Sequence, residues 1–86
     1  DSTNLYAQMM LAKGSLISGQ YDKAITRLET INRINPADLD VLLLLAEVNE
    51  RMGNKSKAIS WYAASLPLVK QAELKTAIEK RMKDLK

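Results

Sequence analysis

The 86-residue sequence predicts an all-α protein. Its apolar residues recur at three- and four-residue spacing along almost the whole chain, which is the period of one face of an α-helix. The strict alternation of apolar and polar residues that is typical of a β-strand is absent. The connections between the periodic segments are only a few residues long, and helices joined in this way pack as antiparallel neighbours. About five such helices are expected.

Five segments carry an apolar stripe with helical spacing: residues 5–16, 21–34, 39–52, 56–66 and 74–85. Gly19 ends the first segment, and Gly53 ends the third in the same way. Pro36 ends the second segment, because the residue before a proline is pushed out of the helical region. Asp38 supplies a side-chain cap for the third segment, and Pro67 interrupts the pattern after the fourth.

The sequence also contains an internal repeat, which becomes visible when the sequence is aligned with itself so that Leu5 is paired with Leu39. We call this shift along the sequence the repeat displacement. Seven positions are identical after it: Leu5 and Leu39, Leu11 and Leu45, Ala12 and Ala46, Gly19 and Gly53, Lys23 and Lys57, Ala24 and Ala58, Ile25 and Ile59. The alanines allow two helices to approach closely, and the glycines allow the turn between them. The larger side chains expected to fill the seams between helices are Leu11, Leu28, Leu45 and Tyr62.

A helix-turn-helix unit of this period resembles the tetratricopeptide repeat. The Leu-Ala pairs at residues 11–12 and 45–46 match the first helix of that repeat, and Ala58 followed by Tyr62 matches the second helix. Pro36 stands at the position of the proline between repeats. The resemblance therefore implies a right-handed α-α superhelix, a short solenoid.

The same resemblance implies how the single domain is divided. The expected parts are a disordered tail at residues 1–4, one repeat at residues 5–38, a second repeat at residues 39–72 and a capping helix at residues 73–86. The last segment does not continue the repeat, because Glu79 and Lys80 stand where the Leu-Ala pair would recur. A terminal helix with one apolar stripe and a charged remainder suits the end of a solenoid, which must face water.

The composition removes most of the usual chemistry of enzymes. The chain has no cysteine and no histidine, so disulfides, thiol nucleophiles, imidazole ligands and histidine bases are excluded. Glu47 and Glu50 are expected on a solvated helix face, and Asp38 and Asp40 at a helix start, rather than as a catalytic pair. A non-enzymatic protein without a cofactor or a metal is expected. The longest apolar run, residues 41–46, is far shorter than the roughly 20 residues that span a bilayer.

The net charge of +3 is concentrated at the end of the sequence. Residues 70–86 contain six basic and three acidic side chains, whereas residues 1–69 contain seven of each. The basic residues alternate with acidic ones and stand near a helix C-terminus, where cations offset the helix dipole. Solvation of a helix is favoured over nucleic-acid binding, and the sequence indicates no cellular compartment.

The resemblance implies a concave groove lined by the first helix of each repeat. The groove positions expected in this sequence are Tyr6, Met9, Lys13 and Leu16, followed by Asp40, Leu43, Glu47 and Glu50, with Met10 and Leu44 beside them. The residues expected to contact a partner are Tyr6, Met9, Lys13, Leu16, Leu43, Leu44 and Glu47. Apolar side chains predominate among them, and exposed apolar surface usually marks an interaction site.

Two functions remain open at this point. The first is a scaffold or adaptor domain that binds a peptide or an amphipathic helix of a protein partner in the groove. The alternative is a terminal structural or oligomerisation segment of a longer repeat protein, in which the groove is covered by upstream repeats or by another copy of the chain.

Overall fold

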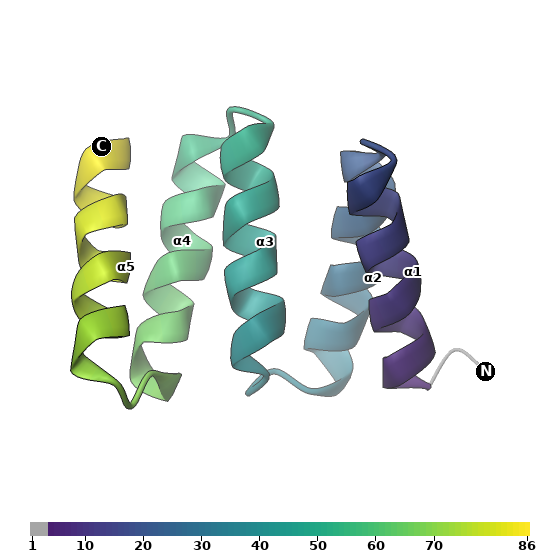
Figure 1. The fold of residues 1–86 in the computed structure, drawn as a ribbon, viewed down its shortest axis with the longest axis horizontal. Helices are drawn as coiled ribbons and strands as arrows, with labels where there is room; N and C mark the ends of the chain where they lie inside the picture. Colours follow the sequence, from purple (N-terminus) through teal and green to yellow (C-terminus); the bar gives the residue numbers. More distant parts are fainter. Residues whose placement is uncertain (1–3) are drawn as a thin grey trace.

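A computed structural model describes residues 4–86 of the chain. The expectation of a disordered tail therefore falls, for residues 1–3, outside the described residues. The elements in chain order are α1 (Leu5–Ile17), α2 (Tyr21–Ile34), α3 (Leu39–Arg51), α4 (Lys55–Ser65), the short 3-10 helix η1 (Leu66–Leu68) and α5 (Ala72–Leu85). Figure 1 shows the five α-helices as a row of antiparallel neighbours. The prediction of an all-α helical repeat fold is confirmed.

The turns and helix starts follow the sequence repeat. Gly19 has a φ of 76° and Gly53 a φ of 80°, and this left-handed conformation reverses the chain after α1 and after α3. Asn4 caps the N-terminus of α1, and Asp38 caps the N-terminus of α3 in the same way. The Ala7 N–H donates to Asn4 Oδ1 at 3.1 Å, and the Val41 N–H donates to Asp38 Oδ1 at 3.3 Å. Asn4, expected to lie in the disordered tail, is instead part of the start of α1.

Each helix packs against the next one in the chain, from α1 on α2 to α4 on α5. The result is elongated, 37 × 26 × 18 Å, with α1 and α5 at opposite ends of the row (Figure 1). In the same view α2 and α4 lie behind, and α1, α3 and α5 lie in front. The front helices are the ones whose side chains form the groove.

Two clusters of buried side chains hold the row together. The first joins α1, α2 and α3 through Ala12, Leu28, Ile31, Val41, Leu45 and Val48. The second joins α3, α4 and α5 through Ala46, Tyr62 and Ile78. Trp61 is half-buried and packs against both clusters, so it bridges the two halves of the row.

The expectation that Leu11 fills a seam is wrong. Leu11 is 50% exposed, whereas Leu45, its equivalent in the second repeat, is completely buried. The difference lies in their neighbours, because α3 packs on α2 while α1 is the first helix of the row (Figure 1). An identical residue at an identical position in the repeat is therefore core in one place and surface in the other.

Candidate functional site

Two adjoining hollows form a groove along the side made by α1, α3 and α5. The α1–α3 hollow has a volume of about 370 Å³, and its apolar lining consists of Leu16, Ile17, Leu44 and Val48. The α3–α5 hollow has a volume of about 440 Å³, and its apolar lining consists of Leu43, Leu74, Ala77 and Ile78. Glu47 lines both hollows. The two hollows therefore adjoin at Glu47 on α3.

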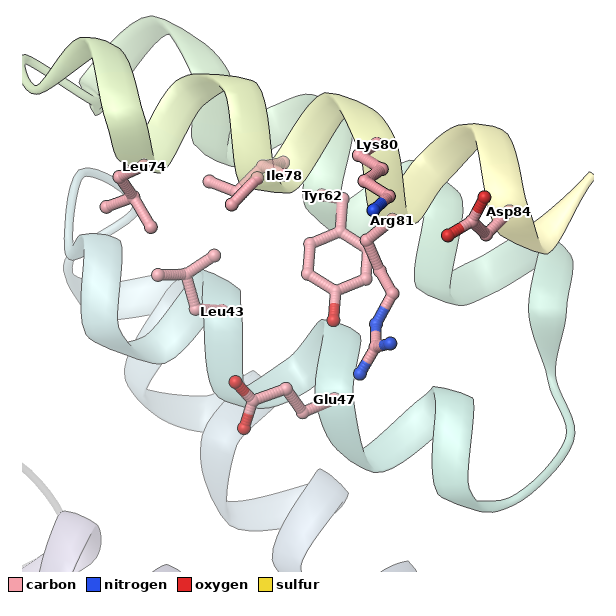
Figure 2. Close-up of a pocket in the computed structure, with 9 residues that line it drawn as sticks. Leu43, Glu47, Tyr62, Leu74, Ile78, Lys80, Arg81 and Asp84 are labelled. Atoms are coloured by element: carbon pink, nitrogen blue, oxygen red, sulfur yellow. The ribbon is translucent and has the colours of Figure 1, made fainter.

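Charged side chains border each hollow. Lys13, Arg51 and Glu47 border the α1–α3 hollow, and Lys80, Arg81, Glu47 and Asp84 border the α3–α5 hollow. Figure 2 shows the apolar side chains of Leu43, Leu74 and Ile78 at one end of the α3–α5 hollow, and Arg81 beside Tyr62 nearer the other. The site thus combines apolar floors with a charged border, which suits a ligand that carries both apolar and charged groups.

The repeat places the central charges in register. The repeat displacement takes Lys13 to Glu47 and Glu47 to Arg81, so one of these residues lies on each of α1, α3 and α5. All three border the groove, so a row of alternating charge, positive, negative and positive, crosses it. We refer to these three residues as the charge row.

Five of the seven predicted partner-contact residues border one of the two hollows: Lys13, Leu16, Leu43, Leu44 and Glu47. The other two do not. Tyr6 is 76% exposed and lines neither hollow. Met9 is half-buried, because it packs against the first core cluster.

Sequence reasoning missed the contribution of α5, which it assigned only to capping. The signal was present in the repeat itself. Applying the repeat displacement once more takes the expected groove positions Asp40, Leu43, Glu47 and Glu50 to Leu74, Ala77, Arg81 and Asp84. All four of these α5 residues line the α3–α5 hollow.

A polar network fixes one wall of the groove. The Tyr62 hydroxyl donates to Glu50 Oε1 at 3.0 Å, and Arg81 Nε lies 3.2 Å from the same oxygen. Residues of α3, α4 and α5 thus meet at a single carboxylate. Burial of the phenol raises the pKa of Tyr62 above its ordinary value of 10.0; Glu50 acts in the same direction, and the hydrogen bond with Arg81 opposes them.

This pKa shift predicts a loss of stability in alkaline solution. Tyr62 makes its full contribution to the free energy of unfolding below pH 10, where the phenol is neutral in both the folded and the unfolded state. Above pH 10 the unfolded phenol loses its proton first, so the free energy of unfolding falls until the pH passes the raised pKa of the folded state. Urea unfolding of the wild type and of Tyr62→Phe at pH 8 to 11 measures this contribution. The wild type should be more stable at pH 8, by about 1 kcal/mol for one hydrogen bond, and the difference should shrink above pH 10. A difference that stays constant over the whole range would contradict the assignment.

Two kinds of site are not found among residues 4–86. No group of three or more acidic side chains there lies close enough together to hold a metal ion. Within the same range, no helix has both the length and the apolar content that crossing a membrane requires.

Paired antiparallel helices that recur along the sequence, stacked in a row with a shared groove, define a helical-repeat protein. A family model of the tetratricopeptide repeat matches residues 15–80, and the chain belongs to this family. No curated protein matches the chain in sequence. The family generally takes part in protein–protein interactions and typically serves as a non-enzymatic scaffold, which indicates protein partners for this chain.

Proposed function

We propose that the groove formed by α1, α3 and α5 binds a peptide or helical segment of a partner protein. The observation that carries this proposal is the position of Glu47, which lines both hollows, so that the two hollows adjoin on α3. In the proposal, residues 5–38 and 39–72 are the two repeats. Residues 73–86 both cap the solenoid and form the third wall of the binding surface.

The chemistry of the groove describes the partner. Apolar side chains would enter the two hollows, on Leu16 and Leu44 at one end and on Leu43 and Leu74 at the other. The charge row would be matched by an acidic, a basic and an acidic residue in that order.

The proposal is tested by selecting peptides and then reversing one charge of the row. A displayed library of random 20-residue peptides is selected on the whole chain, and the affinities of the recovered peptides are measured by fluorescence anisotropy. Glu47→Lys should lower the affinity of the recovered peptides at least tenfold. The substitution makes the middle of the charge row positive, and this charge repels the basic residue of the partner.

Glu29→Lys is the matched control. Glu29 is exposed on α2, behind the groove helices, and this substitution changes the net charge by the same amount. Binding should be unchanged. Peptides that are insensitive to Glu47→Lys, or that lose affinity equally in both variants, would show that the groove is not the binding surface.

A further inference from the structure

The first helix of the row is apolar on almost every side. Only one of the 13 residues of α1, Lys13, carries a charge. The side of α1 that faces away from the core carries six residues without charge, which we call the outer α1 face: Tyr6, Ala7, Met10, Leu11, Gly14 and Ile17. Ile17 also lines the α1–α3 hollow, so this face borders the groove there. A helix at the surface normally turns charged and polar residues to water, so a face of this kind indicates a contact with another protein surface.

The exposure of this face is large. Ile17 is 89% exposed, Tyr6 76%, Met10 53% and Leu11 50%. A Cβ atom built on Gly14 would meet nothing within 4 Å, so the surface is open at that residue. Four large apolar side chains and two small residues therefore lie together on one helix.

The sequence repeat shows what this face is shaped for. The outer α1 residues Ala7, Met10, Leu11 and Gly14 correspond to Val41, Leu44, Leu45 and Val48 of α3. Those four α3 residues belong to the first core cluster or pack against it. These four positions of the outer α1 face thus have the register of a helix–helix interface, and the two small residues among them would allow a close approach. Tyr6 and Ile17 flank them and correspond to the exposed Asp40 and Arg51 of α3.

We propose that a second copy of the chain covers the outer α1 face, through a two-fold symmetric contact of α1 with α1. The opposite end of the row favours this arrangement over a head-to-tail one (Figure 1). There α5 exposes charged side chains, among them Lys75, Glu79 and Lys83. In a head-to-tail contact, α5 would lie against the outer α1 face, and its charged side chains would be buried without partners of opposite charge. Apolar surface is buried on both sides of the contact only when α1 packs against α1 of the other copy.

The sequence of α1 is complementary to itself in the antiparallel direction that a two-fold axis across the helix imposes. With the axis between residues 10 and 11, Met10 of one copy lies opposite Leu11 of the other. In the same register Ala7 lies opposite Gly14, so the small residues meet at two places and the backbones can approach. Tyr6 and Ile17 lie at opposite ends of the face. In the antiparallel pair, Tyr6 of one copy therefore lies at the same end as Ile17 of the other copy.

The size of the face is that of a small, transient interface. From their exposed fractions, the four large side chains would bury on the order of 500 Å² per copy, below the roughly 800 Å² per partner of a standard stable interface. A weak dimer in rapid exchange is therefore expected, largely monomeric at about 5 µM and associating towards about 1 mM.

The test is the molar mass of the whole chain by sedimentation equilibrium, from about 5 µM to about 1 mM. The wild type should rise from the monomer mass of 9.6 kDa towards twice that value. Gly14→Glu should remain monomeric or associate at least tenfold more weakly. This variant should fold as well as the wild type, because its Cβ has open space around it and glutamate favours a helix more than glycine does.

Ile34→Glu is the matched control, since Ile34 is 49% exposed at the end of α2 and the change in net charge is the same. It should dimerise as the wild type does. A wild type that stays at 9.6 kDa over the whole concentration range would overturn the proposal. It would equally be overturned if Gly14→Glu associated as strongly as the wild type, or if Ile34→Glu weakened association to the same extent.

Discussion

A chain that ends at Gln71, and therefore lacks α5, is expected to lose cooperative folding and to aggregate at neutral pH. In the full chain Ile78 is 4% exposed and packs with Ala46 and Tyr62 in the second core cluster. Three further α5 residues pack against that cluster: Leu74, Met82 and Leu85. Each buried aliphatic side chain contributes about 1.5–3 kcal/mol, and a chain of 86 residues has a total stability of about 4–13 kcal/mol.

Truncation acts on both sides of the interface. It removes the apolar stripe of α5, and it uncovers Tyr62, Leu43, Leu66 and Val69 on the elements that α5 covered. The uncovered surface is apolar and contiguous, which favours association of the truncated chains with one another. Thermal unfolding followed by circular dichroism, together with light scattering at the same concentration, measures both consequences.

Two full-length variants distinguish the loss of α5 packing from the absence of the α5 residues themselves. Ile78→Glu places a charge in the second core cluster and should reproduce much of the defect. Thr76→Glu introduces the same charge on an exposed position of the same helix and should unfold as the wild type does. A truncated chain that melts cooperatively at the wild-type temperature and stays unaggregated would contradict the role assigned to α5.

The helices and their turns could be predicted because their causes are local. Gly19 and Gly53 adopt the left-handed conformation that ends a helix, and Asp38 caps α3 as its residue type suggests. The alanines at the repeat positions are buried wherever two helices meet, as Ala12, Ala24, Ala46 and Ala58 all show. Periodicity and residue type were sufficient for this part of the fold.

The remaining features depend on neighbours that are distant in the sequence. Glu50 accepts from Tyr62 on α4 and pairs with Arg81 on α5, and no local pattern announces either contact. The burial of Leu45 and the exposure of Leu11 cannot be told apart from residue type, because the two positions are identical in the repeat. For α5 the apolar stripe predicted a cap, and only a second application of the repeat displacement places Ala77 and Arg81 in the groove.

This pair of leucines yields the second large effect. Leu45→Ala is expected to lower the free energy of unfolding by about 2–5 kcal/mol, the usual cost of removing most of a fully buried leucine side chain. Leu45 is 0% exposed, and it packs in the first core cluster with Leu28, Ile31 and Val48, so the substitution leaves a cavity inside this cluster. Urea unfolding at about 5 µM protein, below the range of the proposed dimer, measures the loss.

Leu11→Ala is the control that the repeat itself supplies. It removes the same atoms from the equivalent position of the first repeat, but from a side chain that is 50% exposed at the end of the row. At the same low concentration its cost should stay below about 1 kcal/mol, as for other surface substitutions. At about 500 µM the cost should increase, because the proposed α1–α1 contact would then add to the stability of the wild type and less to that of the variant. Equal losses for the two leucines at low concentration would mean that Leu11 is as buried in solution as Leu45, and the outer α1 face would not be the open surface that both the fold and the dimer proposal require.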